Sequence, residues 1–298
     1  MSRARHAMRS LAWLVGATTL VATTPQDQQP VFRSVVDSVM VDVSVRQRGR
    51  PTTNLTIRDF ELRDNGIVQT IDDVSREALP IEATLVVDLS GSVQGVLFQK
   101  LVRAVQEVER HLRPTDRTRL VTFNHRVREI VGDGTRPPGA GIAEVVPRGQ
   151  TSLFDGLVLS FIVPPNPSFR QMAIVFTDGQ DTMSFLDARA VLEVARRANI
   201  AVFTVAVAEG TERLPFSAAH EALFKELADQ TGGLTVVLQR DQDLGDAFVR
   251  AIEQFRTSYV LRYTATGVKR EGWHDLTVSV KRSGTYEVRA RRGYFGTK

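Results

Sequence analysis

Hydrophobic residues follow two different patterns along this chain of 298 residues, and the pattern changes near residues 80 and 256. Between these points, continuous apolar runs such as Leu85–Val87, Ile174–Phe176 and Ile200–Val207 alternate with segments whose apolar residues recur at helical spacing. Continuous apolar runs are typical of strands buried on both faces, as in a parallel sheet. The alternation therefore predicts an α/β fold, with a doubly wound, mainly parallel sheet covered by helices on both faces.

Outside this central region, apolar and polar residues alternate one by one. Every second residue from Val39 to Val45 is a valine, and Leu276–Val280 repeats the pattern near the other end. Asn65-Gly66 separates two further runs of this kind, which is a strong signal for a two-residue hairpin turn. Each flanking segment has too few strands to bury a core alone. We therefore expect one small antiparallel β module built from the N- and C-terminal segments together.

The first residues form a basic and then apolar stretch. Arg3, Arg5 and Arg9 precede the apolar segment Leu11–Ala22, and a polar linker follows. This order indicates an export signal, and the apolar part is short for a transmembrane helix. Because the small-residue cleavage context is imperfect, an uncleaved membrane anchor stays an alternative. We expect an exported protein, periplasmic or extracellular.

The patterns together divide the chain into five parts. These are a signal peptide or anchor (1–24), a linker (25–32), an N-terminal β segment (33–78), a central α/β domain (79–256) and a C-terminal β segment (257–298).

Charge and composition exclude some kinds of partner and site. The formal net charge of +4 falls to +1 without Met1–Thr24, which contains three arginines and no acid. A nearly neutral mature chain offers no electrostatic reason to bind nucleic acid. Cysteine is absent, so disulfides and thiolate zinc sites are excluded. The five histidines show no ligand spacing, and we expect them to be structural or exposed.

Candidate chemistry lies where two of the apolar runs end in an aspartate, Asp88 and Asp178. Ser90 and Ser92 follow the first aspartate at spacings of two, and Thr151 stands in a glycine-led turn before a helical segment. The carboxyl ends of parallel strands share one edge of the sheet, where α/β proteins bind ligands. Oxygen ligands that include few carboxylates suit Mg²⁺. The pattern therefore favours a magnesium site at this edge.

The series Asp-x-Ser-x-Ser, then Thr, then Asp resembles the metal-ion-dependent adhesion site of von Willebrand factor type A (VWA) domains, and every position matches. The resemblance covers about residues 80–256, and the flanking β segments with the ending Arg-Arg-Gly-Tyr-Phe look like a bacterial exported subgroup. It implies a site for Mg²⁺, or alternatively Mn²⁺ or Ca²⁺, that bridges to a carboxylate of a partner protein in adhesion or complex assembly. The ligands it implies are Asp88, Ser90, Ser92, Thr151 and Asp178.

Simpler interpretations of single residues stay open from the sequence. The side chains of the Asp88 loop could merely hold its backbone. Thr151 could be the N-cap of the helix that follows. Asp181 is expected to be a loop acid, or a group that supports the ligands from behind, and not a ligand itself. Ser184 and Asp241 are expected to cap the helices that follow them.

Two other classes of function compete with metal-dependent binding. A metal-assisted hydrolase could use Asp88 and Asp178, but no base or nucleophile stands out beside them. The chain has no Gly-x-Ser-x-Gly elbow, phosphate-binding loop or His-Glu-x-x-His motif, so we expect no enzyme. A metal-free structural scaffold is the third class. Loss of a partner on chelation would favour metal-dependent binding, and turnover of a phospho-ester or peptide would favour a hydrolase. The absence of any metal effect would favour the scaffold.

Overall fold

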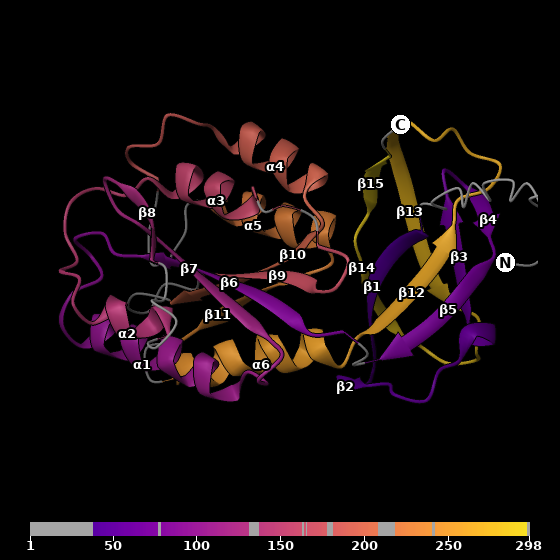
Figure 1. Cartoon of the computed structure of the whole chain (residues 1–298), viewed down its shortest axis with the longest axis horizontal. Helices are drawn as coiled ribbons and strands as arrows, with labels where there is room; N and C mark the ends of the chain where they lie inside the picture. The colour runs from indigo at the N-terminus through magenta and orange to yellow at the C-terminus, as the bar shows by residue number, and fades with distance from the viewer. Residues whose placement is uncertain are drawn as a thin grey trace, which may run out of the picture. The chain divides into compact units, whose positions relative to one another are not determined.

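The computed structural model describes residues 38–76, 79–130, 137–162, 164, 166–177, 181–207, 218–239 and 242–296. The expected export segment, Asp178 and Asp241 lie outside the described residues. Residues 37–298 belong to one compact unit. Within it, a central sheet carries helices, and two further sheets consist of strands alone (Figure 1).

The central sheet has six strands in the order β11-β10-β9-β6-β7-β8. Neighbouring strands are parallel, except for the pair β7 and β8, which forms an antiparallel hairpin. Its strands are β6 (Ile81–Asp88), β7 (Arg117–Phe123), β8 (Val127–Ile130), β9 (Arg170–Thr177), β10 (Ile200–Val207) and β11 (Leu234–Leu238). Every residue of β9 and β10 is buried, as expected for strands covered on both faces.

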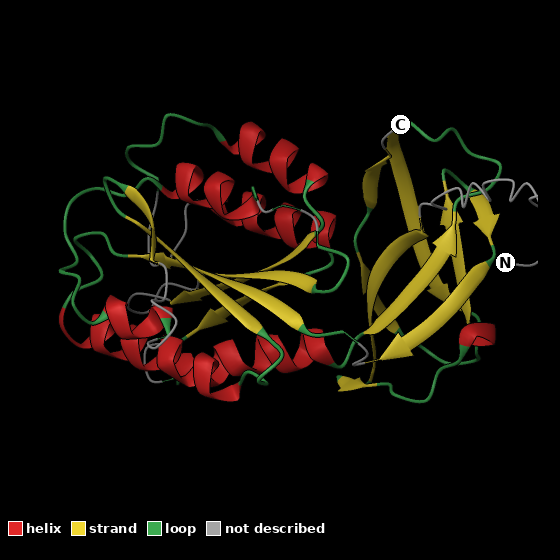
Figure 2. Ribbon diagram, viewed as in Figure 1, coloured by secondary structure: helices red, strands yellow, loops and turns green. Residues whose placement is uncertain are grey.

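Helices cover both faces of this sheet (Figure 2). One core contains residues of α1, α2 and α6, and a second core on the opposite face contains residues of α3, α4 and α5. The helices are α1 (Gly95–His111), α2 (Pro138–Ile142), α3 (Leu153–Phe161), α4 (Ala188–Arg197), α5 (Ala218–Thr231) and α6 (Leu244–Arg256). None of the helices in the described part of the chain is both long and apolar enough to cross a bilayer.

The strands of the N- and C-terminal segments pair with one another in two antiparallel sheets around a shared core. In the first sheet, β1 and β5 pair with β12, β14 pairs with β1, and a short β2 extends β1. In the second, β13 pairs with β3 and β15, and β4 pairs with β3. The strands are β1 (Ser38–Gln47), β2 (Arg50–Pro51), β3 (Phe60–Asp64), β4 (Ile67–Gln69), β5 (Ile71–Arg76), β12 (Tyr259–Thr264), β13 (Gly272–Val280), β14 (Glu287–Ala290) and β15 (Gly293–Gly296), with a 3₁₀ turn at Ile57–Asp59.

Local sequence explains the turns of this β module. Asn65 and Gly66 form the two-residue turn between β3 and β4 with φ angles of 47° and 80°. Positive φ at both positions is the geometry that an Asn-Gly hairpin favours. The C-terminal run is less regular than its alternation suggests, because Arg291 and Arg292 separate β14 from β15.

A buried carboxylate lies at the centre of the β module. Asp64 accepts hydrogen bonds from the hydroxyls of Tyr263 (2.9 Å) and Tyr294 (3.0 Å), and its other oxygen lies 2.8 Å from Nδ1 of His274. Asp64 and His274 are at most 1% exposed. Burial is the largest of the causes that raise the pKa of Tyr294 to about 12, so its hydroxyl stays a donor at neutral pH. These contacts give Asp64 a structural role.

The amino end of β9 is fastened to the β module by Arg170, which is 1% exposed. Its guanidinium donates to Asp42 of β1 at 2.6 Å, to the Phe255 carbonyl at the end of α6 at 2.7 Å, and to Ser258 at 2.7 Å. A cation at a helix C-terminus is also favoured by the helix dipole. The buried charge is therefore paired and hydrogen-bonded, as a charge in a core must be.

Candidate functional site

The candidate site begins at the carboxyl end of β6, next to the middle of the central sheet. Asp88 is the last residue of this strand and is 0% exposed. One carboxylate oxygen accepts the Ser90 backbone N–H at 2.9 Å, and the other accepts the Thr177 hydroxyl at 2.9 Å. Burial raises the pKa of Asp88, while the hydrogen bonds from Ser90 and Thr177 oppose this rise. Asp88 is thus a buried acid whose hydrogen-bond donors are neutral.

Thr177 is a site residue that the sequence interpretation missed. It is the last residue of β9, and the parallel register places Val87 opposite Phe176, so Thr177 follows beside Asp88. The available signal was its position immediately before Asp178 at the end of the second apolar run. Asp178 itself lies outside the described residues.

Ser90 and Ser92 lie together on the loop after β6. Their hydroxyl oxygens are 3.1 Å apart, with Ser90 2% exposed and Ser92 exposed to solvent. Between them, the Gly91 N–H donates to the carbonyl of Gly149 at 2.9 Å. A Cβ on Gly91 would lie 3.3 Å from that carbonyl oxygen, so glycine permits this close approach. The Asp88 loop is therefore joined directly to the loop that carries Thr151.

Thr151 is 7% exposed and belongs to a third connection as well. Its N–H donates to the Thr182 hydroxyl at 2.9 Å, and its carbonyl accepts the N–H groups of Thr182 (2.9 Å) and Met183 (3.1 Å). The N-cap of α3 is Ser152, so the interpretation of Thr151 as an ordinary N-cap is wrong. The structure brings Asp88, Ser90, Ser92 and Thr151 onto hydrogen-bonded loops at one edge of the sheet.

Two expected helix caps are corrected by the structure. The N-cap of α4 is Asp187, which accepts the Ala190 N–H at 2.8 Å, and not Ser184. The Ser184 hydroxyl instead accepts the N–H groups of Phe154 (3.0 Å) and Asp155 (3.2 Å) at the start of α3. Ser184 therefore satisfies donors of the preceding helix, because the loop folds back across it.

The cap of α6 is also displaced from its expected position. Asp243 accepts the Asp246 N–H at 3.0 Å and is the N-cap. Asp181 accepts the Ser184 hydroxyl and the Phe154 N–H.

Histidines near these loops are further groups that the sequence did not single out. Nδ1 of His125 is buried without a hydrogen-bond partner among the described residues. A Cβ on Gly149 would lie 2.4 Å from this nitrogen, and Gly149 has a φ of +83°. His220 lies near Asp181, whose N–H donates to it at 3.4 Å. Burial lowers the pKa of His220, and the Asp181 charge opposes this shift.

The donors at this edge fit a hard divalent cation. They are carboxylate and hydroxyl oxygens, which suit Mg²⁺, Mn²⁺ or Ca²⁺ better than metals that prefer sulfur or imidazole. In the described part of the chain, no three residues among His, Cys, Asp and Glu gather into a metal-binding group. Of the two acids expected as ligands, Asp88 is the one that the structure describes, and a cation would compensate its buried charge.

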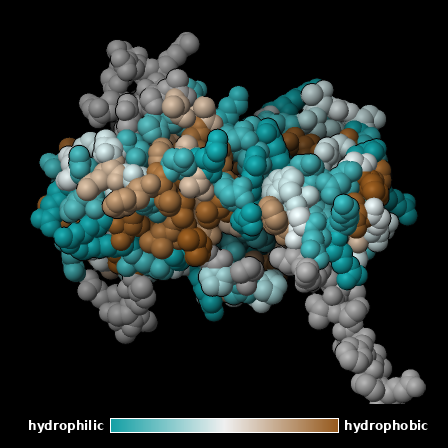
Figure 3. Space-filling view, turned by 90° about the horizontal axis from the view of Figure 1, so that it is seen from above, coloured by the Kyte–Doolittle hydropathy of each residue, from teal (hydrophilic) through white to brown (hydrophobic). Residues whose placement is uncertain are grey.

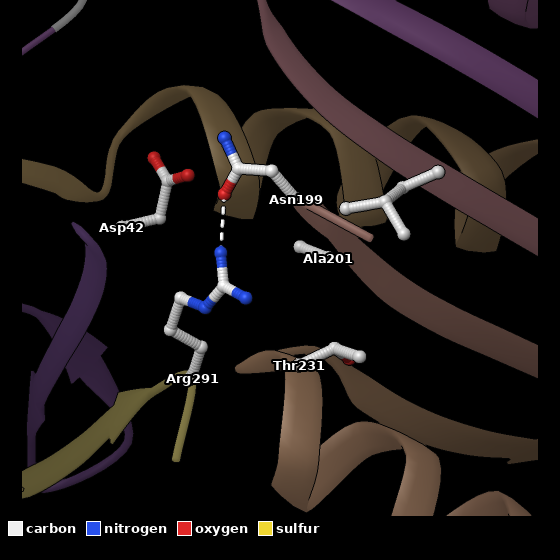
Figure 4. Close-up of a pocket in the computed structure, with 6 residues that line it drawn as sticks. Asp42, Asn199, Ala201, Thr231 and Arg291 are labelled. Carbon is white, nitrogen blue, oxygen red and sulfur yellow. Dashed lines mark hydrogen bonds between the residues drawn. The ribbon is translucent and has the colours of Figure 1, made fainter. Parts of the chain in front are cut away.

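A polar notch lies elsewhere, where β1 and the C-terminal segment meet the central sheet (Figure 4). It is lined by Asp42, Asn199, Ile200, Ala201, Thr231 and Arg291. The Arg291 guanidinium donates to the side-chain carbonyl of Asn199 and, at 2.6 Å, to the backbone carbonyl of Gly293. These bonds tie the C-terminal segment to the sheet and give the notch a structural role.

Comparison with known proteins matches part of the central domain to a family model. The model of the von Willebrand factor type A domain matches residues 157–254. Inter-alpha-trypsin inhibitor heavy chain H2 of Mus musculus is 22% identical over 199 residues, which cover 61% of this chain and 20% of the relative. The Sus scrofa protein is 21% identical over 237 residues, which cover 74% of this chain and 24% of the relative. The chain thus spans about a quarter or less of these curated relatives.

Solved structures are similar to this chain at low sequence identity. The von Willebrand factor type A protein from Catenulispora acidiphila is 12% identical, with a TM-score of 0.52 over 82% of this chain and 75% of that chain. Proximal thread matrix protein 1 from the mussel byssus, solved with zinc in its metal-ion-dependent adhesion site, is 16% identical with a TM-score of 0.48. That match covers 64% of this chain and 49% of the mussel chain.

Proposed function

We propose that this chain, whose residues 157–254 match the von Willebrand factor type A domain, binds a partner protein through a divalent metal ion. The observation that carries the proposal is the buried Asp88 carboxylate, which has neutral donors and lies on a loop bonded to the Thr151 loop. The proposed ligands are Asp88, Ser90, Ser92, Thr151 and Asp178. Mg²⁺ is the preferred ion, with Mn²⁺ and Ca²⁺ as alternatives.

The bound ion supplies positive charge to which a carboxylate of the partner can bind. The chain's own residues prepare the place for it. The Ser90 N–H and the Thr177 hydroxyl hold the two oxygens of Asp88, and the bond from Gly91 to Gly149 fixes the spacing of two loops. Because these groups are already ordered, binding the ion costs less conformational entropy than ordering them at that moment would.

We favour binding over catalysis because the groups around Asp88 are hydroxyls and backbone amides. Thr177 and Ser90 donate to Asp88, and Ser90 and Ser92 share a contact. The contacts that hold Asp88 come from neutral donors, whereas a hydroxyl nucleophile needs an adjacent base to activate it. The hydrolase and the metal-free scaffold are the alternatives that experiment must exclude.

Capture from an exported protein fraction tests this function. The full chain and its Asp88→Ala variant are immobilised and washed with Mg²⁺, and bound protein is then eluted with chelator. We expect the same specific protein to elute from the wild type and not from Asp88→Ala. Asp73→Ala, which changes an exposed aspartate of β5, is the matched control and should behave as wild type. Retention that chelator leaves unchanged would contradict metal-dependent binding.

The same function requires access to partners outside the cytoplasm. We propose that residues 1–24 direct export, either as a cleaved signal or as a membrane tether, because Arg3, Arg5 and Arg9 precede Leu11–Ala22. A fusion of residues 1–30 to a reporter that works only after export should be active, and an inactive reporter would contradict it. Fractionation of the full chain separates a cleaved, released protein from an anchored one.

A further inference from the structure

The loop that precedes α4 presents large apolar side chains to solvent. We call residues 181–187 the Phe185 loop. Phe185 is 98% exposed, Met183 44% and Leu186 39%. Figure 3 shows hydrophobic residues gathered over the helical half of the molecule in this view. A fully exposed phenylalanine is unusual, since a ring of this size gains free energy when it leaves water.

The backbone of this loop is firmly held although its side chains are exposed. One carboxylate oxygen of Asp155 accepts the Phe185 N–H at 3.1 Å, and the other accepts the Leu186 N–H at 3.0 Å. The Met183 N–H donates to the carbonyl of Thr151 at 3.1 Å. The Phe185 loop is therefore bonded directly to a proposed metal ligand, so the loop and that ligand lie side by side at this edge of the sheet.

Two arginines lie on the other loops of the same edge. Arg148 directly precedes Gly149, and its N–H donates to the carbonyl of Leu89 at 3.0 Å. Arg126 lies in the β7–β8 turn, where the Asn124 carbonyl accepts the Ser152 N–H at 2.8 Å. Both arginines are exposed, and among the described residues neither guanidinium forms an ion pair or hydrogen bond. Their charge attracts an acidic partner.

We infer that this edge recognises an acidic peptide segment that carries an apolar side chain close to its carboxylates. One carboxylate binds at the metal site, further acids face Arg126 and Arg148, and the apolar side chain packs on Phe185 and Met183. The inference rests on the proposed metal-dependent function, to which it adds the character of the partner. An exposed aromatic ring on a backbone that is held by hydrogen bonds is the kind of residue that contributes strongly to binding energy at interfaces.

Selection from short random peptides with a central aspartate or glutamate tests the inference. Peptides are selected on the full chain in Mg²⁺, and the strongest binders are synthesised and titrated by fluorescence anisotropy. We expect enrichment of additional acids and of aromatic or aliphatic residues. Phe185→Ser should weaken binding about tenfold or more. Arg148→Gln should weaken it by about threefold and reduce its dependence on salt.

Val68→Ser is the matched control, because Val68 is an apolar residue of β4 that is 52% exposed and lies in the β module. It should bind the peptides as the wild type does. Thermal melts of each variant test whether it is folded.

The outcomes separate the inference from the function on which it rests. If no selected peptide depends on Mg²⁺, the proposed function fails. If binding depends on Mg²⁺ but Phe185→Ser and Arg148→Gln bind like wild type, the function stands and the inference is overturned. If Phe185→Ser instead loses binding to vesicles of an anionic phospholipid while peptide binding is unchanged, the loop contacts lipid and the inference is again overturned.

Discussion

Two aspartates with buried side chains, at opposite ends of the central sheet, differ in whether a neighbouring positive charge compensates their own charge. Asp88 lies at the carboxyl end of β6, and its donors are the backbone amide and hydroxyl of Ser90 and the hydroxyl of Thr177. Asp116 lies just before the amino end of β7, and its side chain is fully buried as well. It accepts the N–H groups of Ile81 and Arg113, each at 2.8 Å, and the guanidinium of Arg256 at 2.9 Å.

The pKa values of the two acids move in opposite directions. Burial raises the pKa of Asp88, and its neutral donors do not outweigh this. Burial also acts to raise the pKa of Asp116, but hydrogen bonds from Arg256, Ile81 and Arg113 outweigh it and lower the pKa. The amino end of the sheet therefore contains its own counter-charge. The carboxyl end has a buried acid whose described donors are neutral, which supports the proposed cation site.

The largest effect is expected for Asp116→Ala. It leaves the Arg256 side chain, which is 5% exposed, without its buried partner. Breaking a buried pair in this way should lower the free energy of unfolding by about 3 kcal/mol. Urea denaturation of the full chain measures the loss. Asp246→Ala removes an exposed acid 4.0 Å from Arg250 and should change stability little. A similarly small change in the free energy of unfolding for both variants would show that Arg256 does not compensate the Asp116 charge in the way proposed.

The next largest effect is the stabilisation of the folded chain by metal, which is expected to depend on Asp88. Mg²⁺ at about a hundredfold excess over its dissociation constant should stabilise the wild type by about 2.7 kcal/mol, because it binds the folded state alone. Asp88→Ala should abolish this gain while the fold stays intact. Its metal-free stability should equal or exceed that of the wild type, since a buried uncompensated charge is removed. Thermal melts with Mg²⁺, Mn²⁺ and chelator test this, and identical wild-type melts would contradict a metal site.

Gly149→Ala tests whether the loops at the carboxyl end must meet closely. The new Cβ would lie 2.4 Å from His125 at a φ of +83°, so both strain and displacement of the histidine are expected. We expect a loss of about 2 kcal/mol together with weaker Mg²⁺ binding. Gly66→Ala has a similar φ of +80° with open space around it, and should cost about 1 kcal/mol without altering Mg²⁺ binding. Equal metal affinity in both variants would show that the Gly91–Gly149 contact does not shape the site.

The smallest effect is a pH dependence at the amino end. The lowered pKa of Asp116 in the folded state means that its contribution is present above the unfolded value of 3.8 and is lost as pH falls through the folded pKa. The stability difference between wild type and Asp116→Asn should therefore be largest near neutral pH and shrink below about pH 4. Urea titrations at several pH values measure it. A difference that grows on acidification would have the wrong sign for an acid held by Arg256.

Sequence patterns alone predicted the elements that depend on neighbouring residues. The continuous apolar runs of β6, β9 and β10 are the buried parallel strands, and Asn65-Gly66 forms the expected hairpin turn. The sequence also predicted that the polar residues of the Asp88 loop lie together, because Asp88, Ser90 and Ser92 are close together in the chain. In each case the residues that carry the sequence pattern are the same neighbouring residues that form the structural element.

The division of the N-terminal β segment was decided by tertiary structure. Its strands do not form one sheet, because β1 and β5 pair with β12 whereas β3 and β4 join the sheet of β13. Pairing of this kind depends on contacts far apart in sequence, which alternation does not encode. The same reason explains why Ser184 hydrogen-bonds to the start of α3 instead of capping α4.

Sequence by itself therefore determined which residues could act as oxygen ligands at the carboxyl edge. Tertiary structure decided that Asp88 is wholly buried, that Thr177 holds its second oxygen, and that Gly91 and Gly149 meet. It also decided that Asp116, whose side chain is buried as well, receives a cation. Desolvation and charge compensation depend on everything that packs around a carboxylate, and those neighbours come from distant parts of the chain.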